Sequence, residues 1–261
     1  MVTDLFQFFS PQNIIIFILV MARFAGMMIN APFFSTYPIP MQVKISIIAL
    51  VAFITYPLVM KNQIVPIPPN IMALSLLILK ELMVGLIMGF CAGLIFIAIE
   101  LAGYFLSMQM GLAVSNVLDP TTNNQSPSIG QLYMFMASFI FLSINGHHWI
   151  FSSIYHSYNV IPIGYDFVIT SSLVEKILFF TGQLFTIAFG LIMPLYGVLL
   201  ITDISLGFMS KAMPQMNVFM VALPLKIYMG LALMIIFLSS TAIYLASLMQ
   251  NLLENISKMF G

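Results

Sequence analysis

The sequence predicts an all-α integral membrane protein with about six apolar segments. Of its 261 residues, 61% are hydrophobic and only 6% are charged, whereas soluble domains carry roughly a quarter charged residues. So few charges cannot cover the surface of a soluble fold. The formal net charge is zero, so nothing indicates nucleic-acid binding, which requires patches of Lys and Arg. Cys91 is the only cysteine, which excludes an intrachain disulfide and a cysteine zinc cluster.

The first two apolar segments have recognisable ends. Residues 13–29 are apolar except for one arginine. We expect Ser10 or Asn13 to cap this helix, with Pro11 in its first turn. Residues 45–60 are short for a membrane span, which needs about 20 residues. Pro57 is expected to kink or stop this second helix.

The third apolar run, residues 71–106, is long enough to form a helix of roughly 54 Å, which exceeds a hydrocarbon core of about 30 Å. Three glycines in it recur every four residues and share one face: Gly85, Gly89 and Gly93. Such a face lets another helix backbone approach closely, as membrane helices do when they associate. The alternative is a chance spacing in a glycine-tolerant helix. If the glycines form a packing face, Gly89→Leu is expected to weaken assembly with a partner subunit.

The second half of the chain contains three more apolar runs. Residues 132–144 are too short to span a membrane alone. Residues 177–201 follow and are expected to end at Asp203. The last run, 218–249, is expected to break at Pro224. Six apolar segments of uneven length result.

Three histidines lie close together after the breaker Asn145-Gly146. His147, His148 and His156 could ligate a metal, but zinc requires three or four well-placed ligands. The spacing of these three histidines does not provide such a set of ligands. Histidines at a membrane interface, beside Trp149, account for the same residues. We therefore expect no metal site and no cofactor. The sequence also lacks a phosphate-binding loop, GxSxG and HExxH, which favours a protein that is not an enzyme.

Charged side chains within or beside the apolar segments have two interpretations. They could mark a transport pathway or a proton relay, as in a stand-alone secondary transporter. They could instead sit at segment ends, snorkel to an interface or pair with partner subunits, which we favour because the adjacent Lys80 and Glu81 point in different directions on a helix. A transporter of this kind also predicts an inverted repeat, and we find none. The charges are Arg23, Lys80, Glu81, Glu100, Asp203 and Lys226.

The stretch 103–131 is polar but carries only one charge, Asp119. Its prolines cannot continue a helix. An ordinary loop between helices is one interpretation. The other is a segment folded against protein in or near the membrane, where backbone groups need partners and charge is costly.

Several blocks in order carry a family resemblance: LSMQMGLAVSNVLDP, NGHHWI with IPIG following, and DISLGFMSKAMPQMNVF with PLK. Together they resemble the FliR/SctT family of type III export-gate membrane proteins, and the flagellar FliR branch more than the injectisome SctT branch. The asparagine-rich run 121–125 departs from the pattern. The resemblance implies a P-like portion at about 1–170 and a Q-like helical hairpin at about 171–261. It also implies kinked hairpins packed mostly on partners in a cone-shaped gate.

The resemblance further implies what particular residues do. The central stretch, roughly 108–128, is expected to plug the closed pore, and a turn is expected at its cytoplasmic mouth. The plug residues are Met108, Gln109, Met110, Gly111, Asp119 and Pro120. The mouth residues are Pro214, Gln215 and Asn217.

The partners implied are FliP-type and FliQ-type subunits, an FlhB-type switch subunit, an FlhA-type export subunit, unfolded flagellar substrates and membrane lipid. The implied location is the bacterial inner membrane at the flagellar basal body. The alternative function is an injectisome export-gate subunit, followed by the stand-alone transporter.

Overall fold

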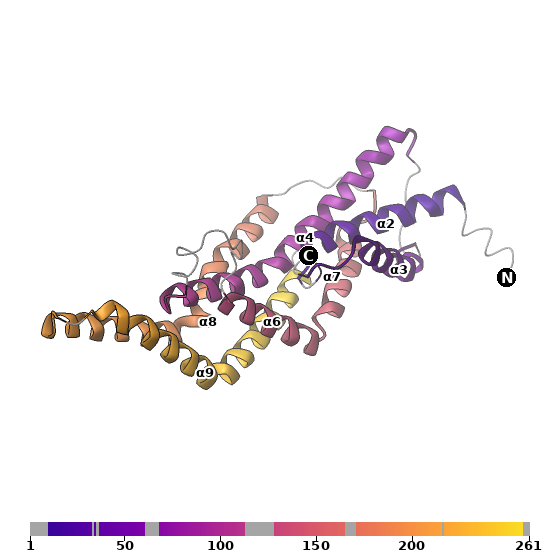
Figure 1. The fold of residues 1–261 in the computed structure, drawn as a ribbon. Helices are drawn as coiled ribbons and strands as arrows, with labels where there is room; N and C mark the ends of the chain where they lie inside the picture. The colour runs from indigo at the N-terminus through magenta and orange to yellow at the C-terminus, as the bar shows by residue number, and fades with distance from the viewer. Residues whose placement is uncertain are drawn as a thin grey trace. The chain divides into compact units, whose positions relative to one another are not determined.

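The computed structural model describes residues 10–32, 34, 37–60, 68–112, 128–164, 171–215 and 217–257. In these ranges its regular elements are all helices, which confirms the predicted fold class (Figure 1). They are α2 (Pro11–Asn30), α3 (Met41–Met60), α4 (Ile71–Gln109), α6 (Ser128–Ser143), α7 (Gly146–Val160), α8 (Ser171–Ala212) and α9 (Val218–Ser257).

Five helices are long and apolar enough to cross a membrane. α6 and α7 would add a sixth span if taken together, although they are bent by 66° at their junction. The prediction of about six apolar segments is therefore confirmed, and the chain is a multi-pass membrane protein. α4, α8 and α9 contain 39, 42 and 40 residues. Each is about 60 Å long, twice the thickness of a hydrocarbon core.

Local signals at helix ends act as expected. The Asn13 N–H donates to Ser10 Oγ at 3.4 Å, and Pro11 occupies the first turn of α2. Asn145 adopts a left-handed conformation with φ 57° between α6 and α7. An asparagine tolerates this conformation better than most residues do, and the predicted break at Asn145-Gly146 is confirmed.

Two predicted breaks are wrong. α8 continues through Asp203 to Ala212, and α9 continues through Pro224. Pro57 does not stop α3 at its own position, since the helix ends three residues later; the expected kink stays a prediction. A proline removes one backbone hydrogen bond, but flanking turns and side chains can compensate within a membrane helix. The Asp203 carboxylate, inside α8, has partners on two other helices, as described below.

The chain forms two compact units, which are described separately. Unit 1 comprises Met1–Leu94, Asn145–Thr181 and Asn251–Gly261, and unit 2 comprises Ile95–Ile144 and Gly182–Gln250. In unit 1, α2 packs against α3, and α3 contacts α7. Its core includes Leu19, Val20 and Met27 of α2. In unit 2, buried side chains come from α4, α6, α8 and α9, among them Leu106, Ala137, Leu195 and Leu245.

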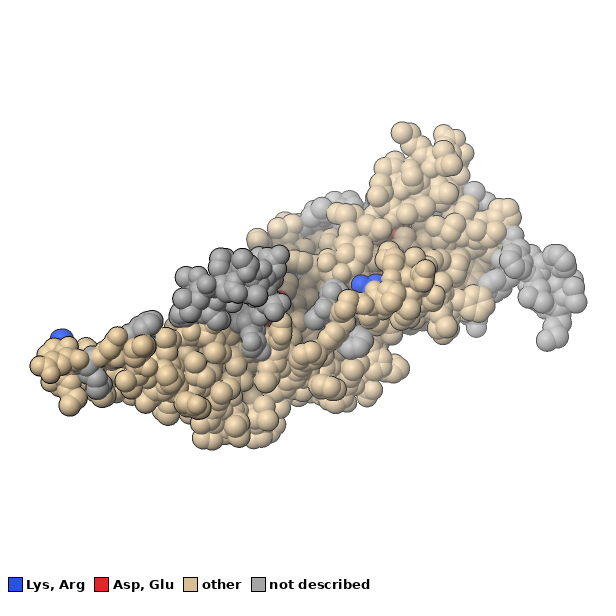
Figure 2. All heavy atoms as spheres, in the orientation of Figure 1, with Lys and Arg blue, Asp and Glu red and all other residues tan. Residues whose placement is uncertain are grey.

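The described surface is almost devoid of charge. Figure 2 shows one face on which charged groups are rare among apolar and uncharged polar atoms. The helices differ in how far the chain itself covers them. In α4, 67% of the most apolar window is buried, whereas in α9 only 11% is buried. Most of α9 therefore requires lipid or another protein to cover it.

Candidate functional site

In unit 1, Arg23 of α2 is fully buried and forms an ion pair with Glu81 of α4. Arg23 Nε donates to Glu81 Oε2 at 2.6 Å, and the two side chains are 0% and 5% exposed. The residues lie 58 positions apart in the sequence. Charged groups buried this deeply are tolerated only when they are paired and hydrogen-bonded.

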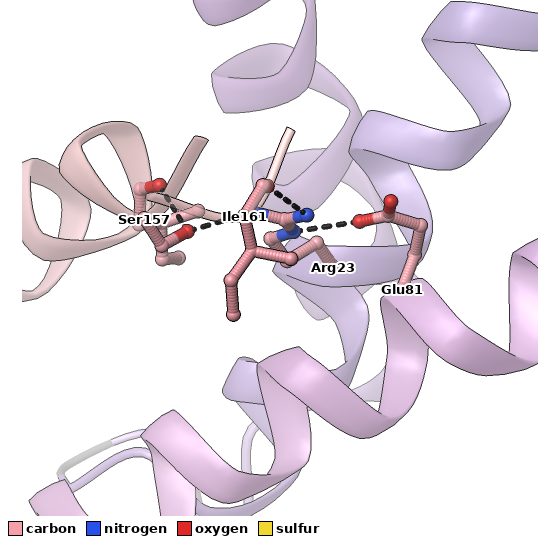
Figure 3. A network of polar contacts seen from close by, with 5 residues as sticks. Arg23, Glu81, Ser157 and Ile161 are labelled. Carbon is pink, nitrogen blue, oxygen red and sulfur yellow. Dashed lines mark hydrogen bonds and ion pairs between the residues drawn. The ribbon is translucent and has the colours of Figure 1, made fainter. Parts of the chain in front are cut away.

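The remaining guanidinium nitrogens bind the C-terminal end of α7 (Figure 3). Arg23 Nη1 donates to Ser157 Oγ at 2.9 Å, and Nη2 donates to the Ile161 carbonyl at 3.0 Å. The guanidinium carbon also lies 4.1 Å from the centroid of the Tyr158 ring, within cation–π range. Arg23 therefore links α2, α4 and the end of α7 through one planar group.

Glycines explain why Arg23 and Glu81 can meet. A Cβ added at Gly85, one turn after Glu81, would overlap the Arg23 carbonyl oxygen and lie 2.9 Å from the Met27 nitrogen. On the other side, a Cβ at Gly26 would lie 2.9 Å from the Leu86 nitrogen. The two backbones are thus in direct contact, which brings α2 within reach of the Glu81 carboxylate.

The same contact continues along α4. A Cβ at Gly89 would lie 3.0 Å from the Cα of Met27, and one at Gly93 would lie 2.7 Å from the Asn30 carbonyl oxygen. The glycine face singled out from the sequence therefore lies against α2 of the same chain.

In unit 2, Asp203 of α8 binds residues of two other helices. Its Oδ2 accepts a hydrogen bond from Gln109 Nε2 of α4 at 2.8 Å. Its Oδ1 forms an ion pair with Lys226 Nζ of α9. The Asp203 and Lys226 side chains are 36% and 19% exposed, so this cluster is more open to its surroundings than Arg23 and Glu81 are.

Next to this cluster, α4 ends in a common C-terminal capping motif. Gly111 has φ 80°; its N–H donates to the Met108 carbonyl, and the Leu112 N–H donates to the Ser107 carbonyl, each at 3.0 Å. This pattern is a Schellman motif, which a glycine in the left-handed conformation favours. Met110, at the C-cap, is fully buried, and its Cε lies 2.5 Å from where a Cβ of Gly230 would be.

Two more contacts hold the same part of α4 in unit 2. Gly103 meets Gly130 of α6 so closely that an added Cβ would lie 2.9 Å from the Gly130 nitrogen. Phe105 stacks on Phe189 of α8, with ring centroids 5.1 Å apart. The last turns of α4 are therefore packed against α6, α8 and α9.

The sequence comparisons identify the family. The family model described as "Bacterial export proteins, family 1" matches residues 14–252. The chain belongs to this family.

Curated relatives come from two secretion contexts. The chain is 34% identical over 227 residues to the flagellar biosynthetic protein FliR of Bacillus subtilis, which covers 85% of this chain and 86% of that protein. It is 31% identical over 244 residues to the surface presentation of antigens protein SpaR of Shigella sonnei, covering 92% of each. FliR of Escherichia coli is 26% identical over 217 residues, or 81% of this chain and 80% of that protein. The predicted FliR/SctT resemblance is thus confirmed.

The predicted plug residues of this bacterial export protein lie in different surroundings. Met108 is half exposed, whereas Met110 is fully buried against Gly230. Gln109 binds Asp203, and Gly111 forms the turn after α4. Asp119 and Pro120 lie outside the described residues.

The other predicted site residues are also dispersed. The turn residues Pro214, Gln215 and Asn217 are exposed between α8 and α9. On α4, Lys80 is half-buried and Glu100 is exposed. Within the described ranges, no group of three or more His, Cys, Asp or Glu side chains is placed to hold a metal ion.

Sequence reasoning missed both pairings of this export protein. A signal for the first was present: Arg23 and Glu81 carry opposite charges in apolar segments, and each precedes a glycine by three or four residues, Gly26 and Gly85. A signal for the helix stop was also present, because a glycine just after an apolar run marks a helix C-terminus. We found no comparable signal for the bond between Gln109 and Asp203.

Proposed function

We propose that this chain is a core component of a flagellar type III protein export gate. The observation that carries the proposal is the 34% identity to FliR of Bacillus subtilis over 85% of the chain, together with the family match over residues 14–252. The names of the relatives describe biosynthesis and translocation rather than catalysis, in keeping with a protein that is not an enzyme. Its location would be the inner membrane at the basal body.

The uncovered apolar surface supports a multisubunit assembly. Only 11% of the apolar window of α9 and 28% of that of α8 are buried by the chain itself. In the proposed gate, FliP-type and FliQ-type subunits cover much of this surface, and 1–170 and 171–261 act as the P-like and Q-like portions. FlhB-type and FlhA-type subunits meet the complex near the turn at Pro214 and Gln215.

The pore function is assigned to the stretch 108–128. Because it carries one charge, Asp119, it can lie in a protein-lined passage without the cost of burying several charges. In this proposal the stretch obstructs the closed pore against ions and gives way when an unfolded flagellar substrate arrives.

Co-purification tests the assembly. A tagged full-length chain, expressed with its neighbouring export subunits, is expected to be recovered with FliP-type and FliQ-type proteins in fixed proportion. Recovery of the chain alone, under conditions in which those subunits are present in the membrane, would overturn the proposed gate.

Deleting residues 111–126 tests the plug. The deletion is expected to leave the complex recoverable but to let ions leak through the membrane, measured as conductance or as growth inhibition in high salt. The matched control is the same complex carrying Gly207→Ala, at an α8 position where an added Cβ meets nothing within 4 Å. Conductance equal to that of the control would remove the plug assignment.

A second candidate is an injectisome export-gate subunit, favoured by the 31% identity to SpaR over 92% of the chain. Complementation separates the two functions. The gene is expected to restore swimming to a bacterium lacking its own FliR, and not to restore secretion to one lacking its injectisome relative. The reverse result would select the injectisome.

A further inference from the structure

The end of α4 is held by contacts that differ in strength. Gly103, Phe105 and Met110 pack against α6, α8 and α9 through apolar or backbone atoms. Gln109 adds one polar bond, to Asp203. Since Gln109 and Met110 are adjacent, the polar bond and the buried methionine determine together how the last turn of α4 is oriented.

Asp203 uses both carboxylate oxygens, one for each neighbouring helix. Oδ2 accepts from Gln109 of α4, and Oδ1 pairs with Lys226 of α9. Lys226 therefore fixes the direction of the carboxylate, and the carboxylate presents its second oxygen to the amide of Gln109. A hydrogen bond to an ionised acceptor is about twice as strong as one between neutral groups.

The cluster is only partly buried. With side chains 36% and 19% exposed, Asp203 and Lys226 are enclosed by fewer groups of the chain than Arg23 and Glu81 are, so separating them breaks fewer contacts than separating a fully buried pair does. Contacts of this kind belong to the less stable part of a structure, from which moving elements are drawn.

We propose that Asp203 is a positioning residue that latches the last turn of α4, residues 108–112, to α8 and α9, and that Lys226 orients it for this role. While the hydrogen bond between Gln109 and Asp203 is formed, the latch is closed and Met110 stays buried at Gly230. When this bond is lost, the latch is open, the turn withdraws and Met110 becomes exposed. Only its consequence for ion passage rests on the proposed export function.

A cysteine reporter tests the latch directly. Cys91 is the only cysteine, so Cys91→Ala yields a background in which Met110→Cys is the sole thiol. Met110 is 0% exposed, so this thiol is expected to react slowly with a membrane-permeant maleimide in the assembled, full-length complex. Labelling after denaturation measures the total thiol.

Residue exchange separates positioning from general damage. Gln109→Glu places a carboxylate against Asp203 and is expected to speed labelling about tenfold, within the range of coupling between contacting residues. Adding Asp203→Asn exchanges amide and carboxylate across the same contact. Labelling is expected to return close to the starting rate. No acceleration by Gln109→Glu, or no recovery in the double variant, would overturn the latch.

Neutral variants keep the test decisive if the Gln109→Glu chain is not recovered. Gln109→Met, of similar volume, is expected to speed labelling about threefold, since it removes one hydrogen bond to a charged group without adding repulsion. Lys226→Met is expected to have a smaller effect in the same direction. The matched control is Lys211→Met in the exposed last turn of α8, which is expected to change nothing. Equal labelling in all three variants would overturn the latch.

Ion leak, measured in the same variants, distinguishes the latch from the plug. Faster labelling together with leak supports both. Faster labelling without leak keeps the latch and removes the plug from the proposed function. Leak without faster labelling overturns the latch.

Discussion

The two polar clusters of this export protein differ in burial and in the number of partners. In unit 1, Arg23 and Glu81 are almost completely buried, and each guanidinium nitrogen has an acceptor. In unit 2, Asp203 and Lys226 remain partly exposed, and Asp203 divides its two oxygens between two helices. The difference predicts that removing one partner costs more in the first cluster, where a charge would be left buried and unpaired, than in the second.

The backbone contacts beside the clusters show the same difference. The Arg23 cluster lies beside a glycine contact in which backbone meets backbone, at Gly26 and Gly85. The Asp203 cluster lies beside a contact in which a flexible side chain, Met110, meets Gly230. Methionine adapts to changes in its surroundings more easily than a backbone does, so we expect a small shift to cost less in the second region than in the first.

The largest effect is expected when one partner of the buried pair is removed. Arg23→Met leaves Glu81 as an uncompensated buried charge and is expected to destabilise the fold by about 3–5 kcal/mol. The double variant Arg23→Met/Glu81→Leu is expected to recover most of this loss, because no buried charge remains. Thermal unfolding of the purified chain in detergent measures both. If the double variant is as unstable as the single one, the pair is not a coupled unit.

The next largest effect concerns the glycine contact. Gly85→Ala places a methyl group against the Arg23 carbonyl oxygen and is expected to cost about 1–3 kcal/mol. Gly197→Ala is the matched control, since an added Cβ there meets nothing within 4 Å. That control is expected to be neutral or slightly stabilising, because alanine favours helix over glycine by about 1 kcal/mol. Equal melting temperatures for the two variants would show that α2 and α4 do not touch at this position.

A smaller effect is expected at the turn after α4. Gly111 has φ 80°, and the Cβ that alanine or asparagine adds there would lie 2.6 Å from Leu223 Cδ2. Gly111→Ala should therefore cost about 1 kcal/mol through backbone strain, in addition to the cost of moving the leucine side chain. Gly111→Asn should cost less, since asparagine tolerates this conformation. The measurement is again the melting temperature, and the order glycine, asparagine, alanine is the expected ranking. An alanine variant as stable as wild type would contradict the Schellman turn.

The smallest effect is expected at the partly exposed pair, Asp203 and Lys226. Lys226→Met should change the free energy of unfolding by less than about 1 kcal/mol. Raising the salt concentration should reduce part of this difference, because a partly exposed pair is screened more than a fully buried one. The destabilisation caused by Arg23→Met should persist in high salt. A salt dependence that is the same at both clusters would remove the distinction drawn between them.

The sequence alone determined the features that depend on local chemistry. Composition indicated a membrane protein made of helices, Ser10 and Pro11 marked the start of α2, and Asn145-Gly146 marked the break between α6 and α7. The order of motifs indicated the export family, which the family match confirms. Composition, caps and breakers act within a few residues, so they can be recognised without knowing which segments meet.

Only the tertiary structure decided which charges and glycines face one another. Arg23 pairs with Glu81, 58 positions away in the sequence, and Gln109 binds Asp203, 94 positions away. The glycine face at Gly85 was visible in the sequence, but its neighbour, α2, was not. The expected stops at Asp203 and Pro224 are wrong, since α8 and α9 continue through these residues. The cost of a charge or a proline inside a helix depends on whether distant groups compensate for it, and the folded chain alone brings those groups within reach.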